Sequence, residues 1–186
     1  MLAYVSSKIR RTASEWLALG KLNGHFELMI RYSFLDLVPV TIGSSISQSL
    51  ANAADLAAHA EALGFTRYWV AEHHGMAGIA SAATAVVLAH IGAATSTMRI
   101  GSGGVMLPNH APLIIAEQFG TLDALFPGRI DLGLGRAPGS DQRVAQAMRR
   151  NLVSDENQFP RDVVELQAYL AGDDRLGIQA TPGAGS

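Results

Sequence analysis

Short apolar runs alternate with longer segments of helical periodicity along the chain from residue 32 onward. Runs of roughly five apolar residues that end at glycine, proline or polar residues are typical of buried strands, and apolar residues at helical intervals are typical of helices that cover a sheet. This pattern predicts strands at 32–37, 65–71, 100–107 and 130–134, helices at 47–63, 81–94 and 112–125, and a last helix at 161–170. Such regular alternation indicates an α/β fold with a parallel sheet.

The residues at the ends of these segments support the boundaries. Ser47 or Ser49 can cap the first helix, and Gly64 can end it. Pro112 suits the first turn of the third helix, where its missing N–H would be unpaired in any case. From Ala137 the chain is rich in glycine, proline and aspartate, which predicts a long loop before the last helix.

Two α/β architectures agree with this order of elements. A doubly wound dinucleotide-binding domain carries G-x-G-x-x-G at its first strand–helix turn, whereas residues 101–106 and 133–138 begin this pattern and lack its last glycine. A (β/α)8 barrel of the TIM type collects functional residues at the C-terminal ends of its strands. Polar and glycine-rich positions lie at these ends here, at Asp36, Glu72-His73-His74, Asn109-His110 and Gly135-Arg136. The sequence therefore favours the barrel.

The chain is short for such a barrel. A (β/α)8 barrel needs about 250 residues, whereas this sequence has 186 residues and four strand–helix units. We expect residues 29–186 to form the N-terminal half of a barrel, with its first and fourth strands as unpaired edges and its inward-facing apolar residues exposed. This exposure favours a homo-oligomer. We expect the half-barrel to bind any cofactor of the complete barrel weakly. We also expect it to be a truncated product of marginal activity unless a second chain completes the barrel.

Residues 1–28 differ in character from the rest. Lys8, Arg10 and Arg11 precede a short apolar segment, but the apolar core and cleavage site of a secretory signal are missing. We expect these residues to be a poorly structured extension, with the natural start of the protein at Met29.

The overall composition excludes several classes of protein. A formal charge of −2 gives no basic excess for nucleic acid, and no apolar run approaches the ~20 residues of a membrane span. The chain has no cysteine, which excludes disulfides, thiolate metal sites and a cysteine nucleophile. We therefore expect a cytoplasmic protein that acts on a small molecule.

The segment Glu72-His73-His74 is the strongest polar cluster. Adjacent strand residues point to opposite faces, and no third ligand follows at a spacing such as H-E-x-x-H, so we expect no metal site. Histidine titrates near neutral pH, which favours an acid–base site. Histidines that are only hydrogen-bonded at a strand end would give the same pattern.

Two further segments could contact a ligand. Gly103 and Gly104 remove side chains from the middle of a predicted strand, which indicates a bulge, the close approach of a ligand or of another backbone, or close packing against a helix. Arg136, with the glycine-rich residues that follow it and Arg143, could hold an anion through guanidinium and backbone N–H groups.

Four motifs follow one another along the chain: Trp-Val-Ala-Glu-His-His at 69–74, Ile-Gly-Ser-Gly-Gly-Val-Met-Leu-Pro at 100–108, Ala-Glu-Gln at 116–118, and Pro-Gly-Arg-Ile-Asp-Leu-Gly-Leu-Gly-Arg at 127–136. With these motifs the chain resembles the bacterial luciferase-like flavin-dependent monooxygenases over residues 32–183. The resemblance implies a (β/α)8 barrel that reacts reduced FMN with O2 and oxidises an aliphatic or aldehyde-like substrate. It also implies a separate flavin reductase as a partner.

The resemblance also implies roles for the first two motifs. His73 falls on the family's active-site histidine beside the flavin, and Glu72 adjoins it, so we expect both residues to be catalytic. Gly103 and Gly104 match a glycine pair that is joined by a cis peptide bond under the flavin ring, so we expect both to bind the cofactor.

The later motifs supply two more positions. Glu117 matches a position near the flavin ring, and Arg136 matches one near the flavin phosphate. Gly135 stands where bacterial luciferase carries a reactive cysteine, which argues against light emission from a long-chain aldehyde. Two other functions fit the same motifs: hydride transfer with a deazaflavin, and non-catalytic binding of flavin or of a partner.

Overall fold

One five-stranded sheet organises the structure, a computed structural model that describes residues 3–5, 31–137, 142–148 and 158–186. The strands, which lie in the order β1-β5-β4-β3-β2, are β1 (Ala3–Val5), β2 (Ser33–Asp36), β3 (Arg67–Val70), β4 (Arg99–Met106) and β5 (Ile130–Gly135). The helices are α2 (Ile46–Ala62), α3 (Thr84–Ala94), α4 (Pro112–Leu125), α5 (Gln142–Met148) and α6 (Phe159–Ala171), with 3-10 turns η1 (Leu107–Asn109) and η3 (Asp174–Leu176). Strands β2 to β5 pair in parallel, which confirms the predicted fold class.

Strand β1 lies at the edge of the sheet and runs antiparallel to β5, with Tyr4 opposite Gly133. The expectation that the fourth predicted strand is an unpaired edge is therefore wrong, because β1 supplies hydrogen-bond partners to its backbone. Only residues 3–5 of the predicted extension at 1–28 lie within the described part of the chain. Strand β2 ends the sheet on the other side, as expected.

The observed cap of the first helix lies two residues before the nearer of its two predicted caps. Ser45, rather than Ser47 or Ser49, caps α2, and its Oγ accepts the backbone N–H of Gln48 at 3.1 Å. Gly64 follows the helix with a φ of 83°, a left-handed conformation that suits glycine as the predicted stop. No helix in the described ranges is long and apolar enough to cross a membrane.

The later helices agree with the prediction except in one segment. Helix α4 begins at Pro112, as expected, but the long loop predicted from Ala137 contains α5. A Cβ placed on Gly75 would lie 2.5 Å from Val144 Cγ2, so α5 packs against the turn that follows the Glu-His-His segment. This tertiary contact is not visible in the local composition, which is why the helix was missed.

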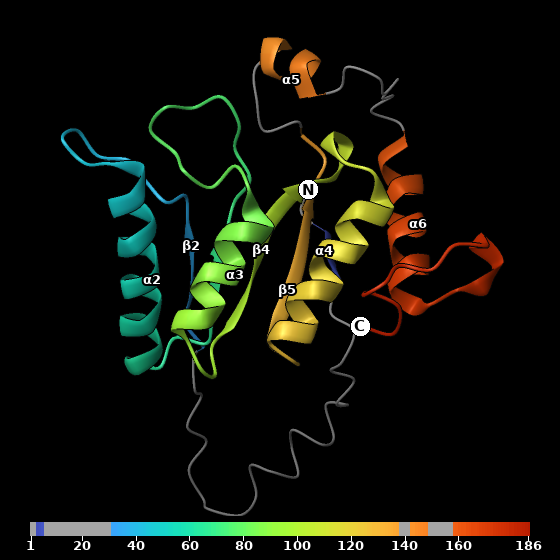
Figure 1. The fold of residues 1–186 in the computed structure, drawn as a ribbon, viewed down its shortest axis with the longest axis horizontal. Coiled ribbons are helices and arrows are strands. Elements are labelled where there is room, and N and C mark those ends of the chain that lie inside the picture. Colours follow the sequence, from blue (N-terminus) through green and yellow to red (C-terminus); the bar gives the residue numbers. More distant parts are fainter. Residues whose placement is uncertain (1–2, 6–30, 138–141, 149–157) are drawn as a thin grey trace, which may run out of the picture.

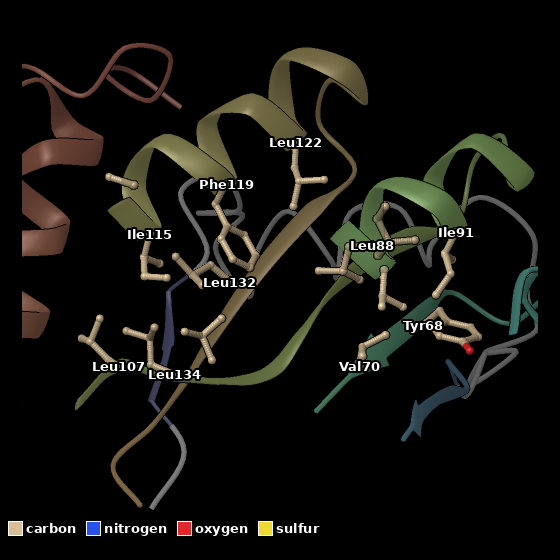
Figure 2. Close-up of a cluster of buried hydrophobic side chains, with 14 of the residues drawn as sticks. Tyr68, Val70, Leu88, Ile91, Leu107, Ile115, Phe119, Leu122, Leu132 and Leu134 are labelled. Atoms are coloured by element: carbon tan, nitrogen blue, oxygen red, sulfur yellow. The ribbon is translucent and has the colours of Figure 1, made fainter. Parts of the chain in front are cut away.

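The apolar core lies between the sheet and the helices α3 and α4 (Figure 1). Side chains of β3 and β5 meet those of the two helices in Figure 2: Tyr68, Val70, Leu132 and Leu134 from the strands, with Leu88, Ile91, Ile115, Phe119 and Leu122 from the helices. Full burial of such a side chain stabilises the fold by roughly 1.5–3 kcal/mol. Because strand residues alternate between faces, this core fixes which residues point to the other face of the sheet.

The face of the sheet opposite this core carries a buried carboxylate. Asp131 of β5 accepts hydrogen bonds from Arg67 Nε at 3.0 Å, Arg99 Nε at 2.8 Å and Trp69 Nε1 at 3.3 Å, and its side chain is fully shielded from solvent. Leu35 of β2 lies on the same face and is 53% exposed. This face therefore combines a hydrogen-bonded ion cluster with an exposed apolar side chain.

Candidate functional site

Glu72 lies two residues after the end of β3, and its carboxylate is almost fully buried. Its Oε1 accepts hydrogen bonds from the Nε2 atoms of His74 at 2.7 Å and His110 at 2.8 Å, and from Asn109 Nδ2 at 3.3 Å. Its Oε2 accepts the backbone N–H of Met106 at 3.0 Å. The carboxylate therefore ties the end of β3 to the turn that follows β4. We refer to Glu72, His74 and His110 as the carboxylate–imidazole cluster.

The protonation state of Glu72 follows from these contacts. Burial raises the pKa of Glu72, but the hydrogen bonds from His110, His74 and the Met106 N–H outweigh this effect, so the pKa lies below its usual range. Glu72 is thus a carboxylate at neutral pH, and each imidazole donates a hydrogen bond to it through its Nε2–H group. A carboxylate with both oxygens engaged is suited to orienting neighbouring groups.

His73, the expected acid–base residue, takes no part in these hydrogen bonds. Its side chain is partly buried, and its Nδ1 is shielded from solvent with no hydrogen-bond partner in the described part of the chain. Leaving a buried polar nitrogen unpaired costs roughly 1–3 kcal/mol. Such an atom points to a ligand that would complete its hydrogen bonding.

The peptide bond between Gly103 and Gly104 is cis, which confirms the bond that the resemblance implied. A Cβ on Gly103 would lie 2.8 Å from Leu35 Cδ1 and 2.9 Å from Trp69 Cε3, whereas a Cβ on Gly104 would lie 2.8 Å from the carbonyl oxygen of Gly133. These nearest neighbours belong to strands, so the alternative of close packing against a helix is wrong, whereas the alternative of a close approach by another backbone is confirmed for Gly104. Gly103 faces the side of the sheet opposite the helical core.

The structure does not bring the other two expected cofactor-binding residues into the carboxylate–imidazole cluster. Glu117 lies on α4 and is partly buried, and Arg136 follows β5 and is exposed. Arg143 is exposed on α5, and the segment 138–141 lies outside the described residues, so the anion-binding loop stays a prediction. A Cβ on Gly135 would overlap Met106 Sδ, so a cysteine at this position would require Met106 to move.

A pocket of about 100 Å³ adjoins the carboxylate–imidazole cluster on the helical side of the sheet. It is lined by Glu72 and His110, by the start of α3 at 82–86, and by Val105, Ile115 and Gln118. Pockets that hold drug-sized ligands measure roughly 300–1,000 Å³, so this one has room for water or a small ion but not for a flavin.

The sequence identified Asn109-His110 as polar residues at a strand end but did not connect them to Glu72. A signal was available, because the C-terminal ends of neighbouring parallel strands lie side by side and β3 pairs with β4. The sequence does not give the conformation of the turn after each strand, and this conformation decides whether the side chains of Glu72 and His110 meet.

The sequence of this chain is similar to those of several known proteins. The family model described as luciferase-like monooxygenase matches residues 30–166. A protein of Escherichia coli K12 named luciferase-like monooxygenase is 56% identical over 157 residues, which cover 84% of this chain and 47% of that protein. The N-acetyl-S-alkylcysteine monooxygenase of Bacillus subtilis is 41% identical over 145 residues, which cover 78% of this chain and 43% of that protein. The chain spans about half the length of the curated relatives it matches.

Solved structures give the same result for the fold. The structure of apo-MsnO8 matches with a TM-score of 0.77 and 40% identity, over 82% of this chain and 46% of that one. The oxygenating constituent of 3,6-diketocamphane monooxygenase of Pseudomonas putida, solved in complex with FMN, matches with a TM-score of 0.64 and 18% identity, over 77% of this chain and 40% of that one. At this identity the second match shows a shared fold.

Proposed function

Since the chain belongs to the luciferase-like monooxygenase family, we propose that it is part of a flavin-dependent monooxygenase that uses reduced FMN and O2 to oxidise a small organic substrate. The observation that carries this proposal is the buried, unpartnered Nδ1 of His73 just beyond the C-terminal end of β3. In barrel enzymes the catalytic residues lie at this edge of the sheet. An imidazole there can accept or donate a proton near neutral pH, which is the role we assign to His73.

The sheet face opposite the helical core has features that suit the binding of a flat aromatic cofactor. Gly103 presents no side chain on this face, and its neighbours there are the partly buried Trp69 and the half-exposed Leu35. Gly104 adjoins the His73 segment, because its carbonyl oxygen accepts the backbone N–H of Glu72. We assign both glycines to the flavin ring, and bound reduced FMN would supply the electrons that activate O2. Glu117 and Arg136 remain proposed contacts of the ring and phosphate.

We assign Glu72 a positioning role in this reaction. Its carboxylate oxygens are occupied by His74, His110, Asn109 and the Met106 N–H, so it cannot take a proton from a substrate without breaking these bonds. The same bonds hold the segment that carries His73 against the turn after β4. Glu72 therefore contributes through the placement of His73.

The experiment follows oxygen into the product. The full chain would be mixed with FMN, NADH, a separate flavin reductase and a panel of small aliphatic substrates under ¹⁸O2. We expect O2 uptake above that of the reductase alone and one ¹⁸O atom in the product. Flavin binding without incorporation would indicate a non-catalytic binder, and anaerobic hydride transfer from a reduced deazaflavin would indicate the deazaflavin alternative.

A further inference from the structure

The carboxylate–imidazole cluster offers a set of metal-binding groups, whose only role in the proposed oxygenation is to place His73. We propose that Glu72, His74 and His110 bind a zinc ion, with the adjoining pocket as its open coordination position. Their ligand atoms, one carboxylate oxygen and two imidazole nitrogens, all lie within 4.8 Å of one another. Two histidines and one carboxylate, with a fourth position left for water, form a donor set that zinc uses in proteins.

The two sequence arguments against a metal do not apply to this set of three residues. Adjacent side chains do diverge, but Glu72 and His74 are separated by one residue and meet, while His73 between them stays outside the cluster. The third ligand comes from His110, which follows the neighbouring strand and has no fixed spacing from the first two in sequence. A search for a short local motif therefore misses it.

The two distances from Glu72 to the imidazoles require only a small adjustment. The two Nε2 atoms lie 2.7 and 2.8 Å from Glu72 Oε1, whereas ligands of a tetrahedral zinc ion lie roughly 3.3 Å apart. Each imidazole must therefore retreat by about half an ångström and lose its Nε2 proton, which neutral histidine can do by changing tautomer. The side chains of His74 and His110 are 19% and 25% exposed, so neither is enclosed on all sides.

The surroundings of the cluster favour a cation with one open position. Glu72 Oε2 stays bound to the Met106 N–H, and such outer contacts orient metal ligands. The pocket of about 100 Å³ reaches both Glu72 and His110, and the lining residues that the structure describes include no lysine or arginine. A water molecule or small anion can therefore complete the coordination without competition from a protein cation.

The test uses the full chain near neutral pH and the metal alone. Zn²⁺ would be titrated in competition with a chromophoric chelator, and Co²⁺ would be added as a spectroscopic substitute. We expect one equivalent of Zn²⁺ to bind and Co²⁺ to give the intense visible absorption of a four-coordinate site. His110→Gln keeps an N–H donor for Glu72 but removes the imidazole, so Zn²⁺ affinity should fall at least about tenfold.

The matched control is His90→Gln, because His90 is exposed on α3 and is not among the residues that line the pocket. It should bind Zn²⁺ as the unaltered chain does. Thermal melts of all three proteins would show that His110→Gln is folded. Unaltered Zn²⁺ affinity in His110→Gln, or no stoichiometric binding to the unaltered chain, would overturn the proposal and leave a hydrogen-bonded cluster only. Neither result bears on ¹⁸O incorporation, so this inference and the proposed function fail separately.

Discussion

The backbone N–H of Glu72 donates to the carbonyl oxygen of Gly104 at 3.3 Å, just beyond the last paired residues of β3 and β4. The register of β4 against β5 shifts between Ser102 and Val105, so the glycine pair lies in an irregular part of the strand. The bond joins the Glu-His-His segment to this irregularity. The Glu-His-His segment and the glycine pair, the two motifs with the clearest chemical meaning in the sequence, therefore lie side by side at the C-terminal ends of β3 and β4.

Gly103→Ala is expected to weaken FMN binding with little change in the free energy of unfolding. The added methyl group would lie 2.8 Å from Leu35 Cδ1, the end of a flexible and half-exposed side chain that can move aside, and 2.9 Å from Trp69 Cε3, so the indole ring must shift by a few tenths of an ångström. It would also stand on the face that we assign to the flavin. Titration of FMN, followed by its fluorescence, should show an affinity lower by at least about tenfold, or ~1.4 kcal/mol.

Gly104→Ala is the matched comparison for this variant. Its methyl group would lie 2.8 Å from the Gly133 carbonyl oxygen, which belongs to the backbone of β5 and cannot rotate away. We expect a loss of about 1–3 kcal/mol in the free energy of unfolding, measured with urea. Equal FMN affinity in Gly103→Ala and the unaltered chain would remove Gly103 from the flavin site.

His73→Ala is expected to lower the rate of substrate oxidation by about 10²–10⁴ while leaving FMN affinity nearly unchanged. The reason is that an acid–base residue acts on the reacting proton and contributes little to holding the cofactor. The measurement is ¹⁸O incorporation under saturating reduced FMN, with His90→Ala as the control. A rate equal to that of the unaltered chain would exclude His73 from the mechanism.

The order of strands and helices could be predicted because it depends on local patterns. Alternating apolar runs and helical periodicity gave β2 to β5 and α2 to α4, and Pro112 gave the start of α4. Elements that depend on distant contacts could not be predicted in this way. Strand β1 pairs with β5, which is far away in the sequence, and α5 packs on Gly75, which is also distant.

The candidate site was predictable as a list of residues but not as an arrangement. The resemblance identified the cis bond between Gly103 and Gly104, which the structure contains. The partners of Glu72 depend on two turns that bring His74 and His110 to the same oxygen, and no spacing along the chain encodes this meeting. Convergence of side chains from separate strands is a tertiary property.

Asp131→Ala is expected to lower the free energy of unfolding by about 3 kcal/mol, because the guanidinium groups of Arg67 and Arg99 would lose a fully buried carboxylate. Urea unfolding near neutral pH measures the change. Asp55→Ala serves as the control, since Asp55 is exposed on α2 and should change stability by less than about 0.5 kcal/mol. Similar losses in both variants would show that the ion cluster does not hold the strands together.

Glu61→Gln is expected to make stability less dependent on pH in acid. The Glu61 carboxylate accepts backbone N–H groups of Ser96, Thr97 and Met98 at 2.6–3.1 Å, in the turn between α3 and β4. Burial raises the pKa of Glu61, but these hydrogen bonds outweigh it and set the pKa at about 2, against an ordinary value of 4.5.

A pKa that is lower in the folded than in the unfolded chain means that the Glu61 carboxylate stabilises the fold fully above pH 4.5, and that this contribution disappears as the pH falls toward about 2. Glutamine cannot ionise, so Glu61→Gln should be less stable than the unaltered chain near neutral pH, and the difference should shrink below pH 4.5. Urea unfolding across this range measures the difference, with Asp55→Asn as a control on the same helix. A difference that stays constant down to about pH 2 would show that the hydrogen bonds to the α3–β4 turn do not favour the ionised form of Glu61.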